Sequence, residues 1–267
     1  MSHGWIDGHC HLSDPRLENR IEQVVHESRL AGVDGWVQGG VSPEDWDRQE
    51  RLSARIGGGR VLTSFGLHPW WVTRASGEEL KEGMSQLLER LPRADAAGEM
   101  GLDYSERNRG EEKADVQAEA FRSQLRMAQD VRKPLVLHIV GAKAHTQALD
   151  ILAEFAPFPK GGLVHSFSAS QELAERYVAL GFLLSISGAA TKAGFQKLKK
   201  ALDWLPAEHL VIETDSPDQP PAGVEGLNEP SRLLEVAQAV AELRNESTEA
   251  VLDRSAANLR KLFGRMS

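Results

Sequence analysis

The sequence lacks the features that mark secreted and membrane proteins. Cys10 is its only cysteine, which excludes an internal disulfide. No apolar run reaches the length of about 18 residues at which a transmembrane helix is expected. The N-terminal stretch "MSHGWIDGH" has no basic segment followed by an apolar one, so no signal peptide is expected. These absences together predict a cytoplasmic protein that has no membrane partner.

An excess of basic residues is also lacking. Lysine and arginine number 31 against 39 aspartates and glutamates, which gives a net charge of −8. This balance argues against a broad surface for sequence-independent nucleic-acid binding, because such a surface carries positive charge. It does not exclude a substrate phosphate that metal ions hold in a small pocket.

What the sequence does contain is a regular alternation of short apolar segments and longer amphipathic ones. Eight apolar segments, from "GWIDGHCH" to "HLVIETDSP", are separated by stretches with helical periodicity. One such stretch opens with Ser76 and Glu79 in the spacing of a capping box. This pattern predicts parallel strands joined by helices, and eight of them predict a TIM (β/α)8 barrel of α/β class over residues 1–267. A doubly wound open sheet is the alternative, but no glycine-rich phosphate turn follows the first segment.

The first apolar segment, "GWIDGHCHLS", carries three polar side chains at every second position. Asp7, His9 and His11 should therefore face the same side of a strand, which in a barrel is the interior. A charge in that interior is costly unless it is paired or bound to a metal. Two imidazoles at this spacing can chelate one ion, and Asp7 could accept a ring N–H from one of them. Cys10 has the opposite parity, so we expect it to be buried against the helices and not to be a ligand.

Further histidines and carboxylates stand at the ends of other predicted strands: His68, Glu99, His138, His165 and Asp215. A barrel builds its active site at the carboxyl ends of its strands. Five of the nine histidines fall at such ends. This convergence predicts a metal centre more readily than it predicts a packed core.

The number of candidate ligands favours two divalent metal ions. We expect Glu99 to bridge two ligand sets, which are His9, His11 and Asp215 on one ion and His138 and His165 on the other. Mixed imidazole and carboxylate ligands favour zinc, manganese, iron or nickel over magnesium. Two ions about 3.5–4 Å apart can activate a shared water as the nucleophile and hold the oxygens of a displacement. Asp215 is expected to take the proton of that water, and Glu213, which shares its parity, to support the site by hydrogen bonds.

At these residues the chain resembles the TatD family of metal-dependent hydrolases and DNases. The matching stretches, in order along residues 6–230, are "IDGHCHL", "GLHPWW", "GEMGLDY", "LVLH", "VHSFS", "IETDSP" and "LNEPS". The resemblance implies an amidohydrolase-like TIM barrel, a divalent metal centre held by the same six residues, and hydrolysis of phosphodiester bonds in DNA. It also implies that His68 lies near the substrate phosphate as a hydrogen-bond donor. The alternative for His68 is a side chain that is bonded within the "HPWW" turn.

Other residues of these motifs leave two interpretations open. Asn228 of "LNEP" could bind substrate or fix the loop after the eighth strand. Trp70 and Trp71 could stack on a base or sugar, or could be buried under the rim of the barrel. Asp103 and Tyr104, which follow Glu99, are expected to orient the loop after the fourth strand.

Three functions are compatible with these observations. The first is a metal-dependent phosphodiesterase that acts on single-stranded DNA as a 3′ to 5′ exonuclease. The second is a metal-dependent hydrolase of a small ester, amide or phosphoester, which the acidic net charge and the uncharged Val140 after the fifth-strand histidine favour. The third is a non-catalytic barrel that binds metal or nucleotide.

Overall fold

The computed structural model describes residues 4–57, 59–108, 110–192, 194 and 196–264. Within these residues it forms nine strands: β1 Trp5–Cys10, β2 Val33–Gln38, β3 Val61–Leu62, β4 Ser64–Phe65, β5 Ala96–Asp103, β6 Leu135–Val140, β7 Gly162–Val164, β8 Phe182–Ile186 and β9 Leu210–Ile212. All recorded strand pairs are parallel, in the orders β1-β2-β3 and β4-β5-β6-β7-β8-β9. Only Thr63 separates β3 from β4, so the third predicted strand is present in two pieces.

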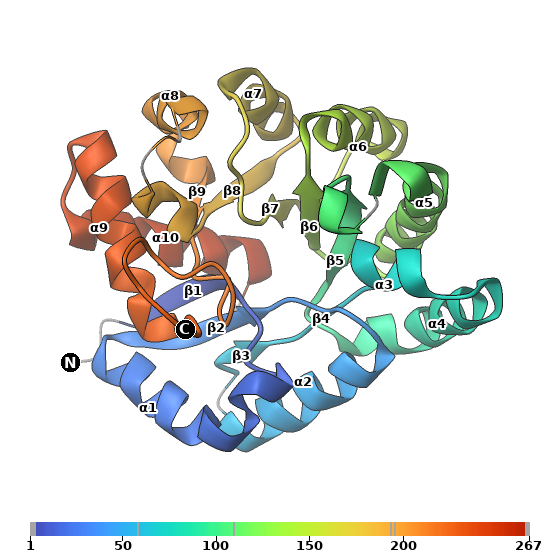
Figure 1. The fold of residues 1–267 in the computed structure, drawn as a ribbon, viewed down its shortest axis with the longest axis horizontal. Coiled ribbons are helices and arrows are strands. Elements are labelled where there is room, and N and C mark those ends of the chain that lie inside the picture. Colours follow the sequence, from blue (N-terminus) through green and yellow to red (C-terminus); the bar gives the residue numbers. More distant parts are fainter. Residues whose placement is uncertain (1–3, 58, 109, 193, 195, 265–267) are drawn as a thin grey trace.

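The first and last strands meet just beyond their carboxyl ends. The amide of Asp215 donates to the carbonyl of His9 at 2.9 Å, and the amide of His11 donates to that of Ser216 at 2.6 Å. These bonds close the sheet on the side where the predicted ligands lie. The predicted TIM barrel is confirmed, because eight β/α units follow one another around a closed ring (Figure 1).

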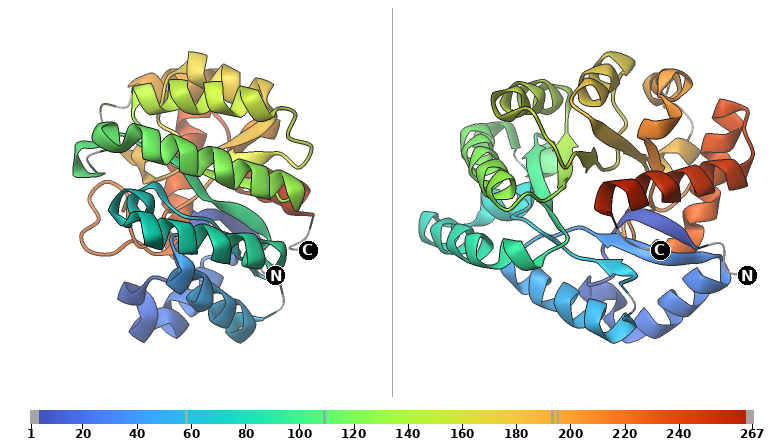
Figure 2. Two further views of the ribbon diagram at one scale, coloured as in Figure 1. Left: turned by 90° about the vertical axis from the view of Figure 1, so that its right-hand side faces the viewer. Right: turned by 180° about the vertical axis from the view of Figure 1, so that it is seen from behind.

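Helices surround this ring of strands (Figures 1 and 2). Those within the described residues are α1 Ile21–Leu30, α2 Pro43–Ile56, α3 Pro69–Arg74, α4 Gly77–Arg90, α5 Ala114–Asp130, α6 Ala142–Phe155, α7 Gln171–Ala179, α8 Gln196–Trp204, α9 Leu233–Arg244 and α10 Thr248–Phe263. The predicted capping box of α4 is confirmed, since Ser76 and Glu79 bond reciprocally. The short helix α3 was not expected from the pattern. Throughout the described part of the chain, no helix combines the length and apolar character needed to span a bilayer.

The interior of the barrel is apolar at its amino-terminal end. Every strand except β4 contributes one buried side chain to this layer: Ile6, Val37, Leu62, Ala96, Val136, Leu163, Leu183 and Val211. Residues of α10, among them Ala256 and Leu259, pack against the layer, and α10 lies across the strands in the rear view (Figure 2). Because one end of the barrel is filled in this way, the polar side chains gather at the other end.

The strict alternation expected along β1 is wrong. Ile6 belongs to the interior layer, and the pairing of β1 with β2 shifts register between Asp7 and Cys10. Such an irregularity changes the face on which the following side chains lie. His9 reaches the interior after the shift, whereas His11 lies beyond the end of the strand. Cys10 is fully buried in the layer between strands and helices, as expected.

Candidate metal centre

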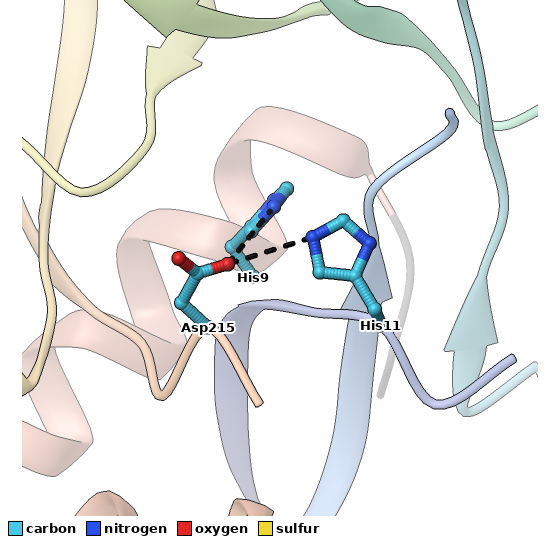
Figure 3. Close-up of side chains that lie close together, drawn as sticks. All are labelled: His9, His11 and Asp215. Carbon is cyan, nitrogen blue, oxygen red and sulfur yellow. Dashed lines mark ion pairs between the residues drawn. The ribbon is translucent and has the colours of Figure 1, made fainter. Parts of the chain in front are cut away.

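The first predicted ligand set lies together at the junction of β1 and β9. Figure 3 shows His9, His11 and Asp215 facing one another. Oδ1 of Asp215 lies 3.8 Å from Nε2 of His9 and 3.5 Å from Nε2 of His11. The two imidazoles also face Oε1 of Glu99, at 3.5 Å and 3.4 Å respectively. Four donor atoms from three strands or strand ends therefore surround one point.

The second set lies on the neighbouring strands and faces the other oxygen of the same carboxylate. Nδ1 of His138, on β6, lies 3.5 Å from Oε2 of Glu99, and Nε2 of His165 lies 2.9 Å from it. The two ring nitrogens lie 2.8 Å apart. The structure thus brings together all six predicted ligands, with one oxygen of Glu99 directed to each set.

The donor atoms are those of a cation site and not those of a satisfied polar core. Both oxygens of Glu99 and both ring nitrogens of His9 are buried without a hydrogen bond of good geometry. Buried polar atoms are normally paired, so such orphans mark a place for an ion or a ligand. Groups of three donor atoms within 4.8 Å of one another include His9, His11 and Asp215, and also His9, Glu99 and His165. Imidazole nitrogens with carboxylate oxygens suit first-row transition metals and zinc.

Gly39, directly after β2, leaves the space that the centre occupies. A Cβ atom at this position would lie 2.3 Å from Oε1 of Glu99 and 2.5 Å from Cε1 of His9. No side chain can be accommodated there unless the ligands move. The sequence signal was the pair "GG" at the end of the second strand, which sequence reasoning did not use.

The charges of the centre stabilise one another. Burial alone would raise the pKa of Glu99, but the nearby rings of His9, His165 and His11 lower this pKa well below its usual value. Burial likewise opposes ionisation of Asp215, whose pKa is nevertheless lowered to about 2 by its hydrogen bond to His11 and by the surrounding histidines. Burial would lower the pKa of His11, yet Glu99 and Asp215 raise it to about 9. Both carboxylates are therefore ionised at neutral pH, which is the form that binds a cation.

His68 stands beside the second ligand set in a defined tautomer. Its Nδ1 accepts a hydrogen bond from the amide of Trp70 at 3.0 Å, so the ring caps α3. Burial and the ring of His138 lower the pKa of His68 well below its usual value, which keeps the ring neutral. A neutral ring that accepts at Nδ1 carries its proton on Nε2. That nitrogen lies 3.8 Å from Oε2 of Glu99. His68 therefore accepts a hydrogen bond within the turn at Nδ1 and directs the N–H of Nε2 toward the site.

Three polar side chains contact candidate ligands at atoms that do not face Glu99. Oδ2 of Asp103 lies 3.2 Å from Nε2 of His138. Oε1 of Glu213 lies 3.5 Å from Nδ1 of His165 and accepts the amide of Ser166 at 2.7 Å. The contact of Asp103 was not predicted, although its even spacing from Glu99 along β5 was a usable signal.

Gln219, the third supporting side chain, lies in the loop after β9. Its amide nitrogen donates to Oδ2 of Asp215 and to the hydroxyl of Ser166, both at 2.6 Å. Its oxygen accepts from the hydroxyl of Ser187 at 3.0 Å. Sequence reasoning missed this residue, because no periodic pattern runs through the loop that carries it.

The expectation for Asp7 is wrong, and the contacts of Asn228 favour one of its two interpretations. Asp7 does not accept a ring N–H: its carboxylate accepts the amide of Thr214 at 2.9 Å and the hydroxyl of the same residue at 2.5 Å. The register shift in β1 directs it to the neighbouring strand end. Asn228 is fully buried, and its amide group donates to the carbonyls of Thr214, Asp218 and Gln219. It therefore fixes the loop after β9 and has no free group for a substrate.

The two tryptophans differ in their contacts. The indole nitrogen of Trp70 donates to Oδ2 of Asp103 at 2.5 Å, and its ring lies 4.8 Å from the ring of His68 between centroids. Trp71 is half-buried and packs against the hydrophobic core. Trp70 thus borders the centre, whereas Trp71 is part of the packing under the rim.

Comparison with known proteins agrees with this geometry. The family model of TatD related DNase matches residues 6–264. The chain is 32% identical over 261 residues to a 3′-5′ ssDNA/RNA exonuclease TatD from Erwinia billingiae, covering 94% of this chain and 96% of that protein. It is 29% identical to the metal-dependent hydrolase YabD of Bacillus subtilis, covering 97% and 98% of the two chains. The crystal structure of the TatD homologue YjjV from Escherichia coli superposes with a TM-score of 0.86 at 29% identity, covering 99% and 100% of the two chains.

The family match spans almost the whole chain and includes every candidate ligand. The histidine and carboxylate groups that could hold metal lie where such a barrel places its active site. The chain therefore belongs to the TatD related DNase family and is a metal-dependent hydrolase.

Proposed function

We propose that this protein is a two-metal phosphodiesterase that hydrolyses single-stranded nucleic acid from its 3′ end. The observation that carries the proposal is the position of Glu99. One of its oxygens faces His9 and His11, and the other faces His138 and His165. A carboxylate with a separate ligand set on each oxygen is suited to bridge two cations.

The proposed ligands are therefore His9, His11 and Asp215 for one ion and His138 and His165 for the other, with Glu99 shared. Two divalent ions in these positions would supply an activated water and neutralise charge on a phosphate. Zinc, manganese, iron and nickel suit the ligand types better than magnesium.

The side chains of the protein supply the proton transfers and the orientation. Asp215 is ionised, and a hydrogen bond from Gln219 to Oδ2 orients its carboxylate, which would accept the proton of the water that attacks the phosphate. Nε2–H of His68 donates to a phosphate oxygen, which favours the charge that develops there. Asp103 fixes the ring of His138 by a hydrogen bond to Nε2, and the carboxylate of Glu213 lies 3.5 Å from Nδ1 of His165. Both contacts are made to the ring nitrogens that face away from Glu99.

The substrate class rests on a relative and not on the geometry of the centre. The Erwinia billingiae protein, 32% identical, is named as an exonuclease of single-stranded DNA and RNA. A site that accepts a strand end also agrees with the seclusion of the ligands, since the side chain of His11 is only 17% exposed and that of Asp215 is 9% exposed.

The same seclusion supports a second candidate, a metal-dependent hydrolase of a small ester, amide or phosphoester. A small substrate needs no extended cationic surface, and the net charge of −8 provides none. The two candidates share the metal centre and differ only in the bond that is cleaved.

A substrate panel under matched metal separates the candidates. The panel contains a 5′-labelled single-stranded oligonucleotide, the same strand in a duplex, and small esters, amides and phosphoesters. We expect stepwise shortening of the single strand from its 3′ end with divalent metal and none with a chelator. Turnover of a small ester or amide with no shortening of the oligonucleotide would favour the second candidate, and activity that survives chelation would overturn both.

Elemental analysis and one ligand variant test the centre itself. We expect close to two transition-metal ions per chain after purification without added metal. His138→Ala should lower turnover by orders of magnitude while the circular dichroism spectrum is kept. His26→Ala is the matched control, because His26 is exposed on α1 and belongs to neither ligand set.

A further inference from the structure

Arg107 lies beside Trp70 at the rim of the candidate metal centre. Its guanidinium carbon lies 5.3 Å from the centroid of the Trp70 ring. It forms no ion pair and no side-chain hydrogen bond within the residues that the structure describes. A guanidinium carries five N–H donors in a planar fork that matches phosphate oxygens. In this stack the fork remains available to a ligand.

Trp70 connects this arginine to the proposed catalytic residues. Its ring centroid lies 4.8 Å from that of His68 and 6.0 Å from that of His138. Its indole nitrogen is held by Asp103 at 2.5 Å. The Trp70 ring therefore contacts both the guanidinium of Arg107 and the ring of His68, which is proposed to donate to the scissile phosphate.

The segment that carries Arg107 is anchored and not a free loop end. It forms the short 3₁₀ turn Glu106–Asn108 after β5. Asn108 is buried, and its side-chain oxygen accepts a hydrogen bond from the hydroxyl of Thr73, at the end of α3, at 2.9 Å. The amide of Asn108 donates to the carbonyl of Ser105 at 3.2 Å. Holding the backbone in this way lowers the entropic cost of placing the arginine for a ligand.

Two other arginines near this face of the barrel are already paired. Arg16 forms ion pairs with Asp14 and Asp218, at 2.8 Å and 2.7 Å, and Arg20 pairs with Glu229 at 2.7 Å. An anion that approaches these arginines must compete with their carboxylates. For Arg107, no carboxylate among the residues that the structure describes forms such an ion pair.

We infer that Arg107, stacked on Trp70, binds the phosphate next to the scissile one and so selects a polyanionic strand over an isolated diester. The inference rests on the proposed function, since it assigns a subsite of the same centre. A strand carries one phosphate for each nucleotide, so a strand whose scissile phosphate lies at His68 presents a second one nearby. The π face of Trp70 supports the guanidinium, and the fork of the guanidinium binds the anion.

Kinetics on two matched oligonucleotides test the assignment. One carries phosphates throughout, and the other has an uncharged methylphosphonate at the linkage on the 5′ side of the scissile bond. For the wild-type protein we expect KM to be about tenfold higher on the methylphosphonate strand. Arg107→Ala should raise KM on the all-phosphate strand by a similar factor and should abolish most of the difference between the two strands. Arg107→Lys keeps the charge but loses the planar fork and much of the contact with Trp70. Its KM on the all-phosphate strand should lie between those of the wild-type protein and Arg107→Ala.

Arg126→Ala is the matched control. Arg126 also lies over an aromatic ring, that of Phe155 at 5.5 Å, but near the carboxyl end of α5 and away from the centre. It should leave both KM values unchanged. Arg107→Ala should also lower the slope of log KM against log salt by about 0.7, the value for one contact to a single strand, whereas Arg126→Ala should not.

The outcomes separate this inference from the proposed function. Hydrolysis of the oligonucleotide with equal KM values for wild type and Arg107→Ala would overturn the inference and leave the proposed function in place. Absence of hydrolysis under every metal would overturn both. A rise in KM of Arg107→Ala that is equal on the two strands would also overturn the inference, because the arginine would then not act through that phosphate.

Discussion

Asp103 and His138 form a carboxylate–imidazole pair in which Oδ2 lies 3.2 Å from Nε2, on the ring edge opposite the nitrogen that faces Glu99. The pair fixes the orientation of the ring. Burial opposes ionisation of Asp103, but its contact with His138 lowers the pKa of the carboxyl, so Asp103 is ionised at neutral pH. Because Asp103 also holds Trp70, one carboxylate positions both a candidate ligand and the aromatic wall beside it.

We predict that Asp103→Asn weakens metal binding by about 10- to 100-fold, as loss of a carboxylate behind a ligating histidine usually does. Metal titration monitored by calorimetry measures the effect, and kcat is expected to recover in part at saturating metal. Asp150→Asn is the control, because Asp150 is exposed and pairs with Arg176 on the surface. Unchanged metal affinity in Asp103→Asn would show that the pair does not position a ligand.

Gly39→Ala tests the space around the bridging carboxylate. The added methyl group would lie 2.3 Å from Oε1 of Glu99, so the ligands must move. We predict a loss of kcat/KM of about a hundredfold, the scale expected for a displacement near 1 Å in an active site, together with a lower metal content. In Gly77→Ala, at the start of α4, the new methyl group has no neighbour within 4 Å, and this variant should retain full activity. Full activity of Gly39→Ala would mean that Glu99 does not bridge in the observed position.

Asn228→Ala distinguishes the two roles considered for this residue. The amide group of Asn228 donates to three backbone carbonyls and its oxygen accepts the amide of Glu229 at 3.0 Å. We predict a loss of about 1–3 kcal/mol in the free energy of unfolding, because these buried carbonyls would lose their donor. Urea unfolding at fixed metal concentration measures it. A variant of unchanged stability whose only defect is a raised KM would instead identify a substrate contact.

The buried His145 predicts a specific dependence of stability on pH. Burial and, to a smaller extent, the ring of His138 lower the pKa of His145 from 6.5 to about 4. Below pH 6.5 the unfolded chain takes up a proton that the folded protein excludes, so stability is complete above pH 6.5 and falls as the pH is lowered toward 4. The loss from this residue should reach about 3 kcal/mol at most. His145→Gln should remove this part of the loss.

The measurement for His145 is the difference between wild type and His145→Gln in urea unfolding at pH 7.5 and pH 5, at equal metal concentration. The side-chain contact to the Tyr177 hydroxyl at 3.0 Å is lost or altered at both pH values and therefore cancels in the comparison. An equal loss of stability on acidification in both proteins would contradict the assigned pKa.

The fold was predictable because each β/α unit repeats a strong local pattern. Apolar segments of strand length alternate with amphipathic helices, and five of the six candidate ligands stand in the carboxyl half of a strand or just after it. Glu99 is the exception to the expected position at a strand end, because β5 continues for four residues beyond it. The parallel barrel brings such ends together, so His138 and Asp215 could be assigned to one centre although they lie far apart in the chain. The resemblance to the TatD family led to the same six residues.

What could not be predicted depends on geometry between segments. The register shift in β1 redirects Asp7 to Thr214, and no periodic rule shows such a shift in advance. The tautomer of His68 follows from one backbone amide in the turn after it. Gln219 lies in a loop without periodicity, so its bond to Asp215 could be identified only from the coordinates.

The closure of the barrel determines when the first proposed ligand set can be completed during synthesis. His9 comes from the first strand and Asp215 follows the last, and the two meet through a bond between their backbones. During synthesis the first proposed ligand set is incomplete until more than two hundred residues have left the ribosome. If this set binds an ion as proposed, capture of that ion is a late event in biogenesis, and a chain cut short before the final strand would keep His9 and His11 but lack the third member of the set.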